Sequence, residues 1–145
     1  MIFPPPLELS LLGLYDAGDP GKERIVLRPT ESVNLAQFGI LLGYKTENGS
    51  IVPLNDHFFW FCEIVVPTPS WIVVFTGEGT FDVIPHAQSG QPVYVFYWGR
   101  KQTIFHDPKA VPIIFQLNAV LIASNPLVTQ NYMQLPTPAQ TPSTD

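Results

Sequence analysis

The residues best suited to chemistry in this sequence are its three histidines, His57, His86 and His106. Two of them stand beside an aspartate, as Asp56-His57 and His106-Asp107, and a histidine paired with a carboxylate can act as a base or as an oriented metal ligand. However, neighbouring side chains on a strand point to opposite faces, so adjacency in sequence does not pair them. Both pairs lie at expected strand ends, where polar residues are ordinary, and no close spacing of metal ligands accompanies them. We therefore predict no catalytic residue, no metal site and no cofactor.

The other reactive side chains are a single cysteine and the acids of one loop. Cys62 is flanked by an aromatic residue and by Glu63, and an apolar setting beside a carboxylate opposes thiolate formation. We expect Cys62 to be a small buried apolar residue. Asp16, Asp19 and Glu23 could hold a cation, but the loop lacks the full ligand set of a calcium loop. We interpret these three acids as part of a solvated turn.

Four consecutive aromatic residues, 58–61, stand in a segment that we interpret as one strand over residues 57–66. In a strand with one wet face, apolar and polar residues alternate, whereas here both faces are apolar. Phe59 and Phe61 share their parity with Glu63, so an outward Glu63 predicts that both rings point outward too. Such a second face is covered by another part of the chain, forms an interface with a protein, or offers a platform to a ligand or sugar.

Aromatic residues also occupy both parities of residues 93–98, and a basic pair follows at an expected hairpin tip. Aromatic side chains are enriched at the centres of interfaces. The candidates for an interface or ligand platform are therefore Phe59, Phe61, Trp71, Tyr97, Trp98 and Arg100.

Charged residues make up only 13% of the 145 residues, and the net charge is −5. So few charges favour an extended apolar surface that is covered by a partner or by another copy. The seven Lys and Arg residues form no basic cluster, which disfavours nucleic acid and anionic membranes as partners. With no signal peptide and no apolar stretch of about 18 residues, we expect a cytoplasmic protein whose partner is a protein, itself or another.

Sixteen prolines and ten glycines interrupt the sequence every few residues, which favours short strands joined by turns. A helix over residues 32–42 is the alternative to a strand in that region. The strands that we expect cover residues 7–15, 23–28, 33–44, 51–54, 57–66, 70–76, 80–84, 93–98, 102–105 and 110–124.

This pattern predicts an all-β fold, an antiparallel β-sandwich of jelly-roll-like type with an extended N-terminal arm and a Pro-rich C-terminal tail. Residues 1–124 are expected to form one domain, and residues 125–145 a Pro/Thr-rich tail that is flexible or docked on a partner surface.

The function that we expect is a non-enzymatic interaction or structural domain that associates through apolar sheet surface or terminal arms, most simply as a homo-oligomer. One alternative is a sandwich that binds a small molecule or glycan on an aromatic platform. The other is a hydrolase or metal enzyme built on the histidines.

Overall fold

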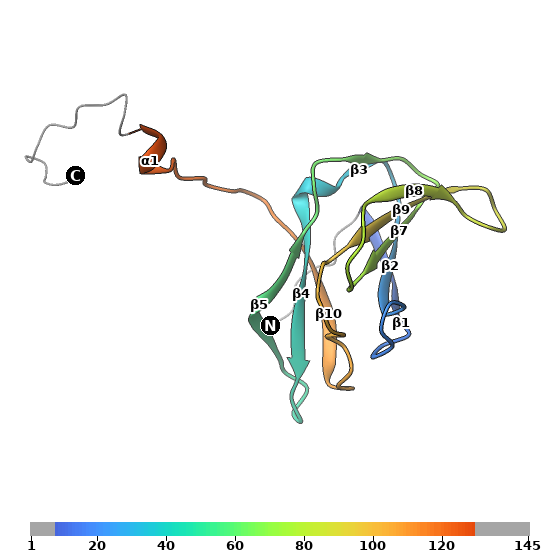
Figure 1. The fold of residues 1–145 in the computed structure, drawn as a ribbon, viewed down its shortest axis with the longest axis horizontal. Coiled ribbons are helices and arrows are strands. Elements are labelled where there is room, and N and C mark those ends of the chain that lie inside the picture. Colours follow the sequence, from blue (N-terminus) through green and yellow to red (C-terminus); the bar gives the residue numbers. More distant parts are fainter. Residues whose placement is uncertain (1–7, 130–145) are drawn as a thin grey trace, which may run out of the picture.

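The computed structural model describes residues 8–129, which form an all-β sandwich, as predicted (Figure 1). Residues 1–7, in which the predicted N-terminal arm begins, and residues 130–145 of the predicted tail lie outside the described residues. Within the described part of the chain, no helix has the length and apolarity needed to span a bilayer.

The larger sheet has five strands in the order β1-β2-β7-β9-β8. Neighbouring strands are antiparallel, except that β9, which lies between β7 and the edge strand β8, runs parallel to β7. The strands are β1 (Leu9–Tyr15), β2 (Arg24–Pro29), β7 (Trp71–Phe75), β8 (Asp82–Pro85) and β9 (Pro92–Tyr97).

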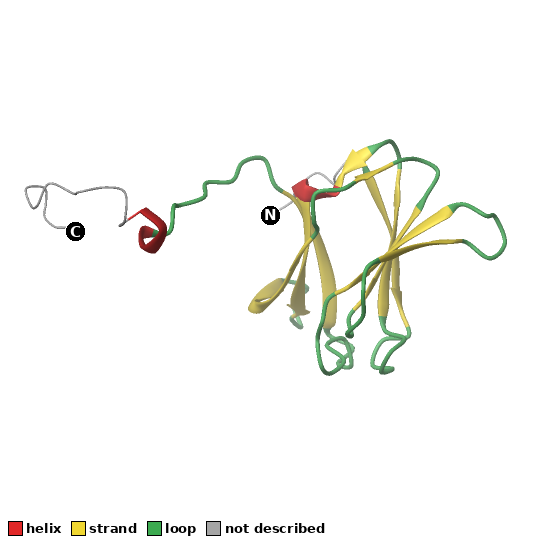
Figure 2. Ribbon diagram, turned by 45° about the horizontal axis from the view of Figure 1, so that its top comes forward, coloured by secondary structure: helices red, strands yellow, loops and turns green. Residues whose placement is uncertain are grey.

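The smaller sheet has three antiparallel strands in the order β10-β4-β5, and a two-stranded ladder of β3 and β6 lies at one end of the sandwich (Figures 1 and 2). A short 3-10 helix, η1, connects β3 to β4, and a short helix, α1, lies on the segment that extends away from the body after β10. The bounds are β3 (Val33–Asn34), η1 (Leu35–Gln37), β4 (Phe38–Lys45), β5 (Ile51–Trp60), β6 (Val65–Val66), β10 (Ala110–Gln116) and α1 (Pro126–Thr129).

The core lies between the two sheets and is built from alternate residues of their strands. Ile25 and Leu27 of β2, Ile72 and Val74 of β7, and Ile40 of β4 are each fully buried. Because side chains alternate along a strand, the residues between them point away from the core. The composition of those outward faces therefore decides what each sheet presents to its surroundings.

Several predicted strand boundaries are wrong. The predicted strand 57–66 is instead the second half of β5, which ends at Trp60, and the short β6. The predicted strand 102–105 is a loop, because the backbone N–H groups of Ile104 and Phe105 bond a buried carboxylate rather than a neighbouring strand. The predicted strand 110–124 ends at Gln116, and the helix considered over residues 32–42 is reduced to η1.

That buried carboxylate belongs to Glu23, which is 1% exposed and precedes β2. Its Oε1 accepts hydrogen bonds from the Thr76 hydroxyl at 2.7 Å and the Ile104 N–H at 2.9 Å. Its Oε2 accepts from the N–H groups of Gly18 at 2.7 Å and Phe105 at 3.0 Å. A carboxylate tolerates burial when such donors replace water. The prediction of a solvated turn is therefore wrong for Glu23, which fastens the loop after β9 to the larger sheet.

Replacing Glu23 by Gln tests this attachment. One carboxylate oxygen becomes an NH2 group that faces two donors, so two buried hydrogen bonds are lost, and we expect the free energy of unfolding to fall by about 2–4 kcal/mol. Urea denaturation measures the change. Glu47→Gln, in an exposed turn, is the matched control and is expected to change stability by less than about 0.5 kcal/mol. Equal stability of the two variants would contradict the role assigned to Glu23.

Candidate functional site

The outward side chains of the smaller sheet form one continuous surface, which we call the apolar face. Ile40 of β4 and Phe59 of β5 are paired and point into the core, so their neighbours along each strand point outward. Within these three strands, the regular part of the surface carries one charged residue, Lys45, at its end, and the β5 bulge carries Asp56, whose side chain is 83% exposed. The apolar face consists of Ile51, Pro53, Phe58 and Trp60 of β5, Gly39, Leu41 and Gly43 of β4, and Val111, Ile113 and Phe115 of β10.

A glycine of the central strand, Gly39, lets the bulky side chains of the flanking strands lie over β4. A Cβ atom on Gly39 would lie 2.6 Å from Cζ of Phe115 and 2.9 Å from the carbonyl oxygen of Phe59. The missing side chain thus allows Phe115 to stack on Phe58 across the central strand, with ring centroids 5.5 Å apart. The indole N–H of Trp60 donates to the Ala36 carbonyl at 2.8 Å, so the ring presents its apolar part.

Two large aromatic rings on the apolar face are open to water. Phe58 is 43% exposed and Trp60 is 46% exposed. An apolar surface of this kind on a sheet is typical of an interaction site.

On the outward face of the larger sheet, polar side chains lie over Trp71. The Trp71 ring stacks on His86, with centroids 4.7 Å apart, and Cζ of Arg28 lies 4.1 Å from the indole centroid. The side-chain oxygen of Gln91 accepts hydrogen bonds from Arg28 at 2.6 Å and from Trp71 at 3.1 Å. Around Trp71, this face therefore meets water through hydrogen-bonding groups.

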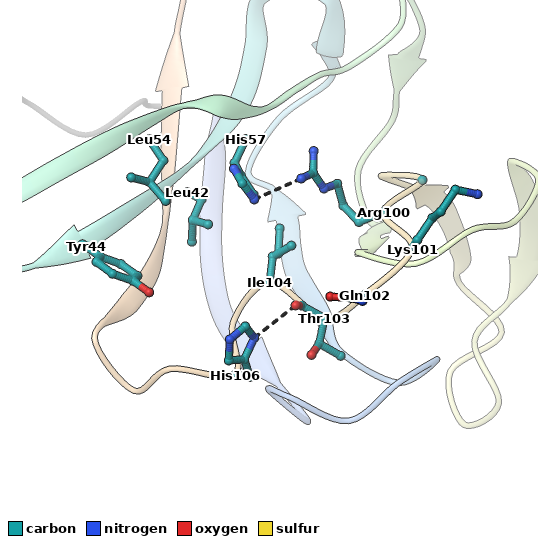
Figure 3. A pocket seen from close by; sticks show the side chains of 11 residues that line it. Leu42, Tyr44, Leu54, His57, Arg100, Lys101, Gln102, Thr103, Ile104 and His106 are labelled. Carbon is teal, nitrogen blue, oxygen red and sulfur yellow. Dashed lines mark hydrogen bonds between the residues drawn. The ribbon is translucent and has the colours of Figure 1, made fainter.

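A cleft of about 550 Å³ lies between β4, β5 and the loop formed by residues 99–106 (Figure 3). Its lining combines apolar side chains with basic ones, and no Asp or Glu is among the lining residues. A smaller hollow of about 370 Å³ borders the same loop from the side of Pro20 and Thr76. The cleft's principal side chains are Leu42, Leu54 and Ile104 on the apolar side and His57, Arg100, Lys101 and His106 on the basic side.

His57 reaches the cleft because β5 carries a bulge. Leu41 pairs with Phe58 and Gly43 pairs with Pro53, so residues 54–57 of β5 lie opposite a single residue of β4. A bulge redirects side chains that strict alternation would separate. Leu54 and His57 consequently both line the cleft (Figure 3).

His57 connects Asp56 to Arg100. Its Nδ1 lies 2.7 Å from Oδ1 of Asp56, and its Nε2 lies 3.0 Å from Nη2 of Arg100. A guanidinium group can only donate, so Nε2 of His57 accepts and Nδ1 donates its proton to Asp56. The hydrogen bond from His57 is the largest cause that holds the pKa of Asp56 below its usual value. The His57 imidazole therefore orients the Arg100 guanidinium, and the Asp56 carboxylate holds the imidazole from its other side.

The other two histidines have different partners. His86 lies against Trp71, and its Nδ1 is 2.9 Å from Oγ of Ser89. Nδ1 of His106 is 3.1 Å from the carbonyl oxygen of Thr103. Among residues 8–129, no three His, Cys, Asp or Glu side chains are placed to hold a metal ion.

The predicted platform residues of the aromatic run lie in the interior. Phe61 is 3% exposed, and Phe59 packs against the core. The expectation that both follow Glu63 outward is wrong, because β5 ends at Trp60 and the chain bends before β6. Cys62 is exposed, so the prediction of a buried cysteine is wrong as well.

The remaining four predicted residues lie in three different places. Trp98 packs against the core. Trp71 and Tyr97 belong to the outward face of the larger sheet, where the Tyr97 ring stacks on Phe75. Arg100 lines the cleft, in a loop rather than at a hairpin tip. The structure therefore does not bring the six residues together into one platform.

The residues that the sequence interpretation missed are Phe58 and Trp60, the opposite parity of the same aromatic run. A further signal lies in β4, where Gly39, Leu41 and Gly43 alternate with three buried residues. Two glycines four residues apart on the same side of a strand leave room for side chains from the flanking strands. That pattern could have identified β4 as the centre of an apolar face.

Comparison with known proteins gives no family for this chain: no protein family matches it, and neither a curated protein nor a solved structure matches significantly. The function is therefore argued from the apolar face and the cleft alone.

Substituting Gly39 by Ala tests how tightly the apolar face is packed. The new Cβ would clash with Phe115 and with a backbone carbonyl, so we expect the free energy of unfolding to fall by about 1–3 kcal/mol. The control is Gly77→Ala, since a Cβ there meets nothing within 4 Å. Urea denaturation of both variants is the measurement, and an unchanged midpoint for Gly39→Ala would show that Phe115 does not cover β4.

Substituting His57 by Leu tests the link between Asp56 and the cleft. Because the hydrogen bond from His57 lowers the pKa of Asp56, its loss should raise that pKa toward the usual 3.8. A lowered pKa in the folded state means that this contact stabilises the fold above pH 3.8 and is lost as the pH falls through the folded-state value. Carboxyl NMR titration reads the pKa directly, and the control His86→Leu should leave it unchanged. An unshifted Asp56 in His57→Leu contradicts the assignment.

Proposed function

We propose that this protein is a non-enzymatic interaction or structural domain that self-associates through the apolar face of its smaller sheet. One observation carries the proposal: the sheet is apolar on both sides, and only one side packs on the larger sheet. Burying exposed rings such as Phe58 and Trp60 against a partner removes apolar area from water, which is the main favourable term in association.

A second copy of the chain is the occupant that the charges favour. Each copy carries a net charge of −5, so two copies repel unless they meet where the charges are few. The apolar face has few charges, namely Lys45 at its end and Asp56 in the β5 bulge. A flat face can pair with itself about a two-fold axis, which is the commonest symmetry of soluble oligomers.

The segment after β10 supports the same proposal. It continues from an edge strand of the smaller sheet and extends away from the body (Figure 1). Along it, Leu121 is fully exposed and Ile122 is 86% exposed. Apolar side chains in this position are available to a neighbouring copy, so we assign this terminal segment an auxiliary role in association.

Substituting Phe58 by Lys tests the proposal. A charge on the apolar face must be buried or repelled on pairing, so we expect the dissociation constant of the dimer to rise by at least about tenfold. Sedimentation equilibrium of the full chain over a range of concentrations measures it.

Ile84→Lys is the matched control, because Ile84 of β8 is 45% exposed but lies outside the apolar face. The control should associate as the unmodified chain does. A chain that stays monomeric at high concentration, or a Phe58→Lys variant that associates as well as the control, overturns the proposal.

A further inference from the structure

We propose that the cleft beside residues 99–106 is a binding site for a small organic oxyanion, a carboxylate or phosphate group attached to a short apolar chain. The site is separate from the apolar face, and the proposal does not depend on self-association.

The charge of Arg100 is the first reason. Its guanidinium donates to the carbonyl oxygen of Asp56 at 3.3 Å and to Nε2 of His57 at 3.0 Å, and both acceptors are neutral. Within the described residues, no carboxylate lies within ion-pair distance of Arg100, although the side chain is half-buried. The Asp56 carboxylate, whose pKa Arg100 helps to lower, acts on it only from behind His57. A guanidinium has five N–H donors in a planar fork that matches carboxylate and phosphate oxygens. Its position therefore suits an oxyanion that the chain itself does not provide.

The neighbouring acids are engaged elsewhere. Asp56 accepts from Nδ1 of His57, and Glu78 lies 3.3 Å from Nζ of Lys101 on the solvent side. Asp107 accepts from the Tyr44 hydroxyl, whose pKa it raises. The carboxylate of Glu23 is buried behind the loop, where it holds backbone N–H groups. None of these carboxylates is among the residues that line the cleft.

The orientation of the basic groups is the second reason. His57 fixes the guanidinium from one side, and Arg100's own backbone N–H bonds the Thr76 carbonyl at 2.9 Å. Lys101 follows directly but points away from His57, with its Nζ 3.3 Å from Glu78, whereas His106 lines the same cleft (Figure 3). A charged group that is held in place before binding loses less entropy when a ligand arrives.

The size and lining of the cleft indicate which chemical group is attached to the oxyanion. A volume of about 550 Å³ is within the usual range for small-molecule sites. Leu54 and the Tyr44 ring supply an apolar wall opposite the basic residues, with the buried core residues Leu42 and Ile104 at its base. A bare inorganic anion leaves that wall unused, whereas a short alkyl chain covers it. We therefore assign the site to amphipathic anions rather than to phosphate alone.

Titration with hexyl phosphate and with hexanoate, followed by two-dimensional NMR of the amide groups, tests the assignment. We expect shifts concentrated on residues 99–106 and on the β5 bulge, with inorganic phosphate and hexanol binding more weakly than hexyl phosphate. Inorganic phosphate that binds as tightly as hexyl phosphate overturns the role of the apolar wall. Shifts scattered over basic residues outside the cleft, or no shifts at millimolar ligand, overturn the site itself.

Substitutions of single basic residues distinguish binding at the cleft from non-specific electrostatic attraction. Arg100→Gln removes the oriented guanidinium, and we expect the dissociation constant for hexyl phosphate to rise by about tenfold or more. Lys101→Gln should raise it less and cannot disturb the fold, because that side chain is 86% exposed. Lys109→Gln makes the same charge change outside the cleft and is the control. Equal weakening by Lys109→Gln and Arg100→Gln rejects the site in favour of non-specific attraction.

Discussion

The architecture of this protein depends on one buried carboxylate. Glu23 collects donors from three separate segments: the loop before β2, the residue that follows β7, and the loop after β9. The last of these loops has no strand partner, so its backbone N–H groups need acceptors from elsewhere. By supplying them, Glu23 holds Ile104 and Phe105 in the core, where they are 8% and 2% exposed. The position of the cleft follows from the same attachment.

The two sheets solve the problem of their outward faces differently. The larger sheet covers Trp71 with the guanidinium of Arg28, although Phe75 and Tyr97 on the same face stack on each other. The smaller sheet stacks Phe58 on Phe115 and leaves Phe58 43% and Trp60 46% exposed. These exposed rings are the basis for assigning association to the smaller sheet.

The fold class followed from the sequence, because prolines and glycines separate alternating apolar segments whose strand character is local. The candidate site could not be predicted from the sequence. It depends on the positions at which the alternation of inward and outward side chains is interrupted. Phe59 and Phe61 are inward and Phe58 is outward, and the sequence cannot show this while the bend after β5 is unknown. Glu23 was equally hidden, since three of its four donors come from residues distant in sequence.

The apolar face could have been inferred from β4 and β10 had the strand order been known. Gly39 is informative only when Phe115 is recognised as its neighbour, and that pairing joins residues far apart in the chain. The cleft has the same origin, because a bulge in β5 and a loop after β9 meet only in the folded sandwich. Local sequence patterns thus determined which residues form strands. Long-range pairing determined which of their side chains form the apolar face and the cleft.

The strand order β10-β4-β5 also limits how copies of this sheet can grow together. Both of its outer strands contain a proline, Pro53 in β5 and Pro112 in β10, and β5 is further distorted by its bulge. A proline removes a backbone donor, and a bulge turns an edge away from a new strand. Sideways addition that would extend the sheet into a fibre is therefore disfavoured at both edges. What remains open is contact through a face, and two faces that cover each other leave nothing for a third copy to join.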